Sequence, residues 1–495
     1  MSLTTSTHDI KTLVLSFHPV IVIETVEEDR VLSLLQSTAL ELRMPFYEWS
    51  ITTGLVRVPG KNIMYGTGEP TSLLSTLHQM DAQAIFLLKD FARFTTDHTV
   101  ARQLREVSQR FSKNRSTIVL SGATIQLPPE IEHTVVYYNL ELPGREELRK
   151  VFNTVLHSLV SANRIEVELD TMDRDELVNA LSGMTLNQAR QTIAFAALKD
   201  GKLTAGATKE ILERKAQVIR ESGLLEYFPV EDNRFQLGGF ARLKSWLLRA
   251  RTGFSREARE LNLPTPRGIL IVGVQGCGKS LAAKVIAREW KLPLVKLDAG
   301  RLFDKYIGES EKNFRKAISL AESMAPVVLW IDEIEKAMVT GGSDADGGLG
   351  RRIFGSFLTW LQEKQQEVFV VATANDLSIL PPELLRKGRF DEIFFVDLPN
   401  ADEREAILTI HLKLRKQDPS QFDFHRLVDA AEGFSGAEIE QAVIASLYRG
   451  LHLKQPLDTE LQVKEIGETV PLSISRREDM QKLREMAEGR FVSVN

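Results

Sequence analysis

The sequence predicts an α/β protein of two related modules, each with a parallel sheet flanked by helices and followed by a smaller helical subdomain. The first observation is a strand pattern, "GILIVGV", that runs through a glycine-rich turn into a segment with apolar residues at helical spacing. The second is "PVVLWIDE", an apolar run typical of a strand covered on both faces, which ends in two acidic residues. The third is a weak internal repeat between the two halves of the chain, at an offset of roughly 250 residues.

The composition is that of an ordinary globular chain. Its 495 residues suffice for roughly two to four domains, and 43% are hydrophobic and 26% charged. The net charge of −5 does not indicate a nucleic-acid partner, although it does not exclude one. A single cysteine excludes an intrachain disulfide and suits a reducing compartment. The apolar runs are far shorter than a membrane span, and the start "MSLTTSTHDIK" lacks the order of a secretory signal, so we expect a cytoplasmic protein.

The strongest motif lies between a predicted strand and a predicted helix. Gly273, Gly278, Lys279 and Ser280 fit the pattern G-x-x-x-x-G-K-[ST], whose backbone N–H groups wrap around phosphates. Lys279 would reach the terminal phosphates and the Ser280 hydroxyl would bind Mg²⁺. The predicted nucleotide-binding residues are Gly273, Val274, Gln275, Gly276, Cys277, Gly278, Lys279 and Ser280.

The acidic pair Asp332 and Glu333 follows a predicted buried strand about fifty residues later. Ligands of α/β sheets collect at the carboxyl ends of the strands, so this pair should lie beside the phosphate loop. We expect Asp332 to hold Mg²⁺ and to bind the nucleotide through it, and Glu333 to polarise the attacking water. The predicted metal ligands are therefore Ser280 and Asp332, with ATP and Mg²⁺ as cofactors.

A third region completes the pattern. Asn375 ends another apolar strand, and Arg386 and Arg389 follow in the stretch "LLRKGRFD". From about Leu237 onward the chain resembles a AAA-type ATPase module. The resemblance implies that Asn375 orients the water, and that Arg386 and Arg389 reach into the site of a neighbouring subunit to stabilise transition-state charge. Arginines that act between subunits imply a homo-oligomeric ring, which we expect to be a hexamer.

The same resemblance extends to the lid and to a central pore. Gly436 and Ala437 match the lid's "SGA" stretch, which in the family lies by the base and ribose. Lys305, Tyr306, Ile307 and Gly308 match the pore loop, in which an aromatic residue grips a translocating chain. Tyr306 packed in a core is the alternative. The glycine-rich stretch 339–352 is a candidate second pore loop.

The first half repeats this framework without its chemistry. "LPPEIEHTVVYYNLELP" parallels "LPPELLRKGRFDEIFFVDLP", and "LVNALSGMTLNQ" parallels "LVDAAEGFSGAE". In this register the turn "ETVEEDRV" lies opposite the phosphate loop, and Lys89 and Asp90 lie opposite the Asp-Glu pair. The turn holds four acidic residues with Arg30 as the one cation, so it should repel phosphate. Accidental similarity of two α/β segments is the alternative.

These observations give the expected domain order. A degenerate AAA-like α/β domain without a nucleotide site (1–142) precedes a small helical, lid-like subdomain (143–199) and a linker helix (200–235). An AAA α/β subdomain (236–398) and a helical lid (399–495) follow. The linker's apolar "LLEYF" could dock on a neighbour.

Over its whole length the chain resembles the AAA family that cyanobacterial genomes and algal plastid genomes encode as a hypothetical chloroplast reading frame. That resemblance implies the cyanobacterial cytoplasm or the plastid stroma. We expect an ATPase that remodels or threads a protein substrate of unknown identity. The alternative is a nucleotide-gated scaffold whose assembly is the output. An ATPase that works on DNA is a third possibility, which the net charge neither supports nor excludes. A fused metalloprotease is not indicated, since no H-E-x-x-H occurs. Cys277, inside the phosphate loop, is either a small filler residue or a redox-sensitive one.

Overall fold

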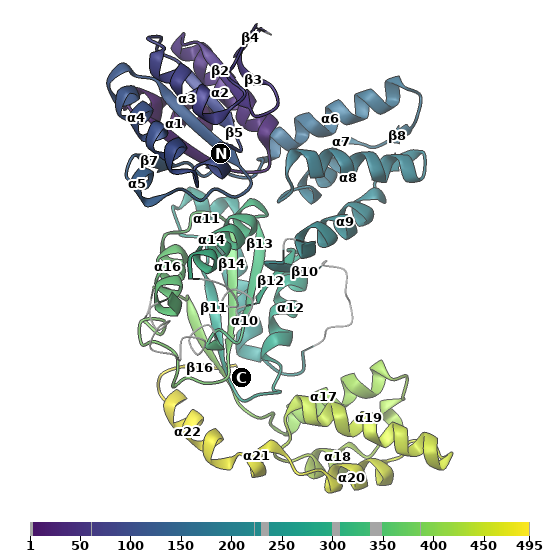
Figure 1. The fold of residues 1–495 in the computed structure, drawn as a ribbon. Coiled ribbons are helices and arrows are strands. Elements are labelled where there is room, and N and C mark those ends of the chain that lie inside the picture. The colour runs from purple at the N-terminus through teal and green to yellow at the C-terminus, as the bar shows by residue number, and fades with distance from the viewer. Residues whose placement is uncertain are drawn as a thin grey trace. The chain divides into compact units, whose positions relative to one another are not determined.

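The structure is a computed structural model that describes residues 3–60, 62–221, 223–228, 237–298, 307–336, 349–386 and 388–494. The Lys305–Tyr306 pair of the predicted pore loop and most of the stretch 339–352 lie outside these ranges. The chain divides into two compact units, Met1–Ile211 and Leu212–Asn495, which are described separately. Both are drawn in Figure 1.

The first unit contains a seven-stranded sheet in the order β4-β3-β2-β5-β6-β1-β7. Its strands are β1 (Val20–Glu24), β2 (Phe46–Ser50), β3 (Gly54–Val58), β4 (Asn62–Met64), β5 (Ile85–Lys89), β6 (Thr117–Gly122) and β7 (Val135–Tyr137). Its helices are α1 (Leu3–Leu15), α2 (Glu28–Leu42), α3 (Pro70–Gln79), η1 (Phe91–Phe94), α4 (His98–Asn114) and α5 (Pro129–Glu132). The β2, β5, β6, β1 and β7 strands run parallel, and β3 and β4 form a hairpin at one edge.

A helical subdomain completes the first unit. It consists of α6 (Arg145–Ser161), α7 (Thr171–Ala180) and α8 (Leu186–Lys199), with a two-stranded parallel sheet of β8 (Glu166–Glu168) and β9 (Lys202–Thr204). Helix α9 (Ala207–Glu221) then spans the boundary between the two units.

The second unit has a sheet in the order β10-β12-β13-β14-β11-β15-β16. The strands are β10 (Leu225–Phe228), β11 (Gly268–Gly273), β12 (Leu294–Asp298), β13 (Val327–Asp332), β14 (Val368–Ala374), β15 (Glu392–Val396) and β16 (Val492–Ser493). The helices around it are α10 (Ala241–Arg251), η2 (Thr252–Phe254), α11 (Arg256–Glu260), α12 (Lys279–Trp290), α14 (Ile307–Ser323), α16 (Leu349–Glu363) and α22 (Arg477–Ala487). The short α21 (Leu472–Ser475) precedes α22, and its Leu472 N–H donates to Glu438 of the lid.

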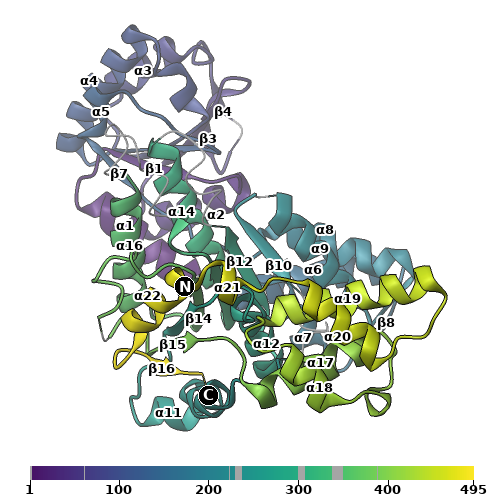
Figure 2. The same cartoon turned by 90° about the horizontal axis from the view of Figure 1, so that it is seen from below.

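The lid of the second unit is a compact group of helices, seen from two sides in Figures 1 and 2. It comprises α17 (Ala401–Leu414), η3 (Pro419–Gln421), α18 (Phe424–Ala430), α19 (Gly436–Leu453) and α20 (Thr459–Glu468). Leu408, Leu427, Val443 and Ile466 form its own buried core. No helix in the described ranges is long and apolar enough to cross a membrane.

Each large sheet is covered by helices on both faces, because its central strands are apolar on both sides. In β1, Val20 and Val22 pack toward α3 and α4, while the alternate residues Ile21 and Ile23 pack toward α1 and α2. The second sheet shows the same alternation, with Leu270 and Val272 of β11 on the face covered by α14 and α16, and Ile269 and Ile271 on the face of α10 and α12. The predicted α/β fold class is confirmed for both modules.

The two sheets share one topology. If the first five parallel strands of each module are numbered along the chain, both sheets place them in the order second, third, fourth, first, fifth, and the second sheet adds the parallel β16 beside the fifth. The backbone conformation also matches at the ends of β5 and β13. Each strand is directly followed by a non-glycine residue with a positive φ, which is 53° at Asp90 and 50° at Glu333. These are the two positions that the sequence repeat aligned.

The helical subdomains also begin alike. Glu147 of α6 accepts a bond from the backbone N–H of Gly144, as Glu403 of α17 does from that of Asn400. Helix α8 starts after the N-cap Thr185, and α19 starts after the N-cap Ser435.

Two expectations about segment boundaries were wrong in part. Within the linker expected at 200–235, β9 pairs with β8 and β10 pairs antiparallel with β12, so its apolar "LLEYF" completes the chain's own sheet. The tail was assigned to the lid, but β16 pairs with β15 and Met480 packs in the core beneath the second sheet. Strands β10 and β16 are too short to be recognised from a sequence pattern, and they form because each can pair with an edge strand of the sheet.

Candidate nucleotide site

The loop between β11 and α12 is held open by glycine. Gly273 has a φ of 144°, and a Cβ there would lie 2.0 Å from the carbonyl oxygen of Val396. At Gly276, with a φ of 78°, a Cβ would lie 2.9 Å from the hydroxyl of Ser435. The loop backbone therefore passes close to its neighbours and arrives at the N-terminus of α12, where N–H groups favour an anion.

Lys279 is folded into this loop. Its ammonium donates to the carbonyl oxygens of Gly273 and Val274, both at 2.8 Å, and the residue is only 6% exposed. Burial lowers the pKa of Lys279 to about 8. Within the described ranges no carboxylate forms an ion pair with it, so its charge would be matched by a phosphate bound in the loop.

Asp332 ends β13 beside the loop. Its Oδ1 accepts bonds from the hydroxyls of Ser280 (3.0 Å) and Thr373 (2.7 Å), and its Oδ2 pairs with the ammonium of Lys296 at 3.0 Å. Burial would raise the pKa of Asp332, but these bonds and the Lys296 charge outweigh it and hold the pKa below its usual value. The hydroxyl of Ser280 and the carboxylate of Asp332 thus form an adjacent pair of hard oxygen ligands that fits Mg²⁺.

Glu333 and Asn375 meet at the same edge of the sheet. The Asn375 amide donates to Oε1 of Glu333 at 2.9 Å, and the Glu333 backbone N–H donates to Thr373 Oγ1 at 3.0 Å. Lys336 forms an ion pair with the other oxygen of the carboxylate. A carboxylate held in this way at the carboxyl edge can accept a proton from a water molecule bound beside it.

Several residues of this cluster were not predicted. Thr373 is one of them, and it lies two positions before the predicted Asn375, so the alternation of side chains along a strand already placed both on one face. Lys296 was visible as a lone charge in a buried strand. Glu335 is 6% exposed, accepts from the backbone N–H of Asn375 at 2.8 Å, and has its pKa raised mainly by burial.

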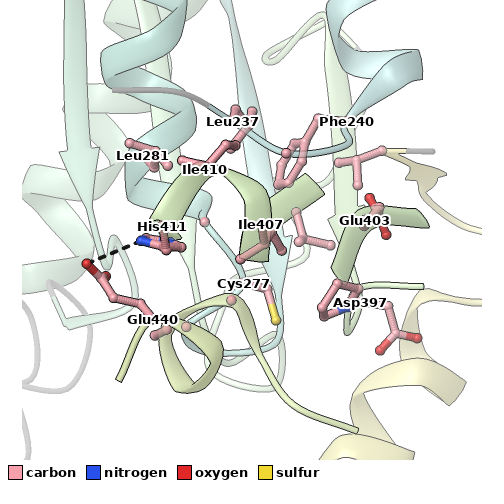
Figure 3. A pocket seen from close by; sticks show the side chains of 18 of the residues that line it. Leu237, Phe240, Cys277, Leu281, Asp397, Glu403, Ile407, Ile410, His411 and Glu440 are labelled. Atoms are coloured by element: carbon pink, nitrogen blue, oxygen red, sulfur yellow. Dashed lines mark ion pairs between the residues drawn. The ribbon is translucent and has the colours of Figure 1, made fainter. Parts of the chain in front are cut away.

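An apolar pocket of about 390 Å³ adjoins the loop. Figure 3 shows Leu237 and Phe240 facing Ile407 and Ile410 of α17, and Cys277 of the loop lines the pocket on the other side of Ile407. The loop touches the lid directly, because the N–H of Ala437 donates to the carbonyl oxygen of Gly276 at 3.0 Å. Gly436 and Ala437 therefore lie at the pocket wall, as expected from their sequence motif.

His411 is a polar group of this pocket. Its ring lies 3.5 Å from the carboxylate of Glu440, which also pairs with Arg415 at 2.8 Å (Figure 3 draws the first contact). Burial lowers the pKa of His411 despite the opposing effect of Glu440. The imidazole is therefore neutral at pH 7, which suits a pocket for an uncharged ring.

The predicted arginines lie apart from this cluster. Arg386 is exposed, whereas Arg389 is half-buried and leaves one guanidinium nitrogen without a hydrogen-bond partner in the described ranges. Neither forms an ion pair with Asp332 or Glu333 among those residues. Of the predicted pore-loop residues, Ile307 is the first residue of α14, and Lys305 and Tyr306 lie outside the described ranges.

The equivalent turn of the first module is filled by its own side chains. Arg30 donates to both oxygens of Glu147 (3.1 and 3.0 Å), to Glu27 (3.2 Å) and to the carbonyl oxygen of Glu141. Glu27 also accepts from the N–H of Leu186, the first residue of α8, at 2.8 Å. The turn is therefore bonded to α6 and α8.

The expectation that Arg30 alone offsets the acidic side chains of that turn was wrong. Lys89 approaches Glu28 at 3.7 Å and Glu48 at 3.8 Å, so Arg30 is not the only cation there. Glu24 accepts a bond from the N–H of Ile125 at 3.2 Å. Glu24, Glu27 and Glu28 of this turn therefore each have a hydrogen-bond or ion-pair partner.

A five-stranded parallel arrangement with a glycine loop, an acidic strand end and a helical lid defines the class of AAA-type P-loop ATPases. The model of the ATPase family associated with various cellular activities (AAA) matches residues 269–398. The models for the N-terminal and second domains of SpoVK-like AAA ATPases match residues 6–140 and 146–222.

Related proteins agree with these matches. The AAA domain-containing protein ycf46 of Trieres chinensis is 36% identical over 95% of this chain and 94% of its own length. That of Pyropia yezoensis is 36% identical over 97% of both chains. The proteasome-activating nucleotidase of Aeropyrum pernix is 32% identical over 44% of this chain and 54% of its own length. The chain belongs to the AAA ATPase family, in the group that contains the ycf46 proteins, as its motifs predicted.

Proposed function

We propose that the second module binds and hydrolyses ATP with Mg²⁺. Lys279 and the loop residues 273–278 would hold the phosphates, and Ser280 and Asp332 would hold the metal ion, which neutralises charge on the transferred phosphoryl group. Glu333 would accept the proton of the attacking water, and Asn375 would fix the orientation of Glu333. The apolar pocket with His411 would take the base and ribose, beside Gly436 and Ala437. The observation that carries the proposal is the 2.9 Å bond between Asn375 and Glu333 beside the Ser280–Asp332 pair.

We propose further that the chain works as a homo-oligomeric ring, expected to be a hexamer. Arg386 is exposed, and Arg389 has one guanidinium nitrogen without a partner among the described residues. Both support a ring, because neither pairs with Asp332 or Glu333 among those residues and both suit a phosphate presented by a neighbour. Within such a ring Tyr306 would contact an unfolded segment of a protein substrate, and ATP hydrolysis would remodel or thread it. For its location we propose the cytoplasm, or the stroma in a plastid-bearing host, on the basis of cysteine usage.

The second candidate is a nucleotide-gated scaffold. It is favoured by one observation, namely that the first module has its loop position bonded shut by Arg30. Such a module would not change with ATP and would offer a constant surface to a partner, while the ATP-bound second module controls assembly.

One set of full-length proteins tests these proposals. Calorimetry on the native chain should give one ATP per chain, and Lys279→Ala should remove it, while Lys316→Ala on the exposed side of α14 should not. A second ATP per chain would instead mean that the first module binds nucleotide. If Lys279→Ala binds ATP normally, the site assignment is wrong.

Function beyond hydrolysis needs two further measurements. Native mass spectrometry of Glu333→Gln with ATP should show the ring, and the matched Glu363→Gln should show it only transiently. Fluorescein-labelled casein serves as an unfolded-chain probe, whose binding should depend on ATP and on Tyr306. ATP-dependent assembly without casein binding would favour the scaffold.

A further inference from the structure

The end of β4 and the turn that leads to α3 expose three consecutive apolar side chains. Tyr65 is 97% exposed, Ile63 is 51% exposed and Met64 is 37% exposed. Tyr65 does not stabilise the described fold by burial, and an exposed aromatic residue with apolar neighbours is typical of a contact surface.

This turn is nevertheless firmly anchored. Thr67 is 2% exposed, and its hydroxyl accepts from the N–H of Leu55 at 2.8 Å and donates to the carbonyl oxygen of Met64 at 2.6 Å. The indole N–H of the fully buried Trp49 donates to the Thr67 carbonyl oxygen at 2.6 Å. Gly66 supplies the positive φ, 78°, that the turn requires. Tyr65 is therefore presented outward from a fixed base.

Tyr65 and Tyr306 occupy comparable positions along the chain, because each precedes the helix that leads to the third parallel strand of its module. Strand β4 is antiparallel to β3, which is antiparallel to β2, so β4 ends at the same edge as the parallel strands. Tyr65 lies between this strand end and α3, as Tyr306 lies between the end of β12 and α14 in the chain order. Helices α3 and α14 are equivalents, since each precedes the third parallel strand of its sheet, β5 or β13.

The side chains at this turn fit an extended polypeptide. A single turn of three apolar residues offers far less than the roughly 800 Å² per partner that a stable folded complex buries. An aromatic ring and a flexible Met side chain give contact that tolerates many sequences. Weak contacts of this kind gain strength when each subunit of an assembly contributes a copy.

We propose that Tyr65, with Ile63 and Met64, is a second contact site for an unfolded protein segment, in a module that does not use ATP. The proposal rests on the proposed function and adds a stationary aromatic site to the ATP-driven one at Tyr306. The chain would then hold a substrate at Tyr65 while Tyr306 moves it.

Photo-crosslinking on the full-length Glu333→Gln protein with ATP tests this. p-Benzoylphenylalanine replaces Tyr65, Tyr306 or, as a control, Tyr137, which is 54% exposed on β7 at the opposite edge of the same sheet. Fluorescein-labelled casein is the probe. Crosslinks to casein are expected from positions 65 and 306 and not from 137. Tyr65→Ala should weaken casein binding about tenfold, while Tyr65→Phe and Tyr137→Ala should not.

The outcomes separate the two proposals. Casein captured from 306 but not from 65 overturns the inference and leaves the proposed function intact. Capture from neither position overturns both. A crosslink from position 65 to a second copy of the chain would make this turn a subunit contact and overturns the inference. Capture from 65 alone supports the inference and contradicts the role of Tyr306.

Discussion

The amide of Asn375 lies 2.9 Å from the carboxylate of Glu333, although the two residues follow different strands. The bond exists because β13 and β14 are parallel neighbours whose carboxyl ends meet at one edge. It fixes one oxygen of Glu333 and leaves the direction of the other to its ion pair with Lys336. ATP hydrolysis should therefore be sensitive to a substitution that removes the charge of Glu333 but keeps the shape of its side chain.

Glu333→Gln should bind ATP and Mg²⁺ and hydrolyse ATP at least about 100-fold more slowly. A glutamine side-chain oxygen can still accept from Asn375, so the geometry is kept and only the base is lost. Phosphate release and equilibrium binding of a fluorescent ATP analogue measure the two effects. Hydrolysis within a factor of two of the native rate would show that another group is the base.

Lys279 should make ATP binding dependent on pH. Burial lowers its pKa to about 8 in the free protein, whereas bound phosphate favours the ammonium form. ATP binding above pH 8 then requires proton uptake, so affinity should fall by up to about tenfold per pH unit as pH rises. Calorimetry at pH 9 in buffers of different ionisation enthalpy should detect the proton, and at pH 7 it should not.

Lys279→Arg is the matched control, because a guanidinium stays protonated through this range. Its ATP affinity, whatever its absolute value, should be flat between pH 7 and pH 9. An equally flat affinity in the native protein would contradict the prediction.

Arg30→Met should weaken the first module strongly. It leaves the buried carboxylates of Glu27 and Glu147 without their cation, which typically costs about 3–5 kcal/mol. Hydrogen exchange should rise in α2, α6 and α8, the elements that this network joins. Lys89→Met breaks longer, more exposed ion pairs and should cost less than about 1 kcal/mol. Equal effects of the two changes would show that the network is not structural.

Local patterns were sufficient for the elements that carry the motifs. The strands of "GILIVGV" and "PVVLWI" are long apolar runs, and their flanking turns and helix were predicted where β11, α12 and β13 lie. The phosphate loop and the acidic strand end could be placed at one edge from sheet topology alone. The sequence therefore predicted that Ser280 and Asp332 lie close together, but it did not predict the hydrogen bond between them.

Contacts between distant segments could not be predicted in the same way. Lys296 meets Asp332 only through the register of β12 on β13, which no local pattern specifies. Strands β10 and β16 consist of four and two residues and depend on β12 and β15 for their pairing. No local pattern in the sequence indicates that Arg30 is buried, because its ion pair with Glu147 depends on the position of α6.

Cys277 should be an unreactive thiol. Burial raises its pKa to about 12, with Lys279 opposing the rise only in part. At pH 8 the thiolate fraction should be about 1000-fold below that of an ordinary cysteine. Because it is the one cysteine of the chain, a disulfide reagent should label the native protein slowly and the urea-unfolded protein fast. Rapid native labelling would revive the redox alternative.

Lys215 should lower the stability of the second unit, most strongly below neutral pH. It is 3% exposed on α9, beside the ring of Tyr227 at 5.5 Å, and burial lowers its pKa to about 7. In the unfolded chain a lysine titrates near about 10.4. Between these values the unfolded state binds the proton and the native state does not, so the free energy of unfolding should rise with pH. The slope from this residue should be at most about 1.4 kcal/mol per pH unit.

Lys215→Met tests this effect, because it keeps the buried volume and removes the charge. It should raise the melting temperature most at pH 6, where the native state must hold a buried ammonium, and little at pH 10, where the native lysine is already neutral. The matched Lys209→Met, on the same helix but less buried, should change neither value. A melting temperature that is equally raised at both pH values would show that packing, and not the charge, limits stability at this position.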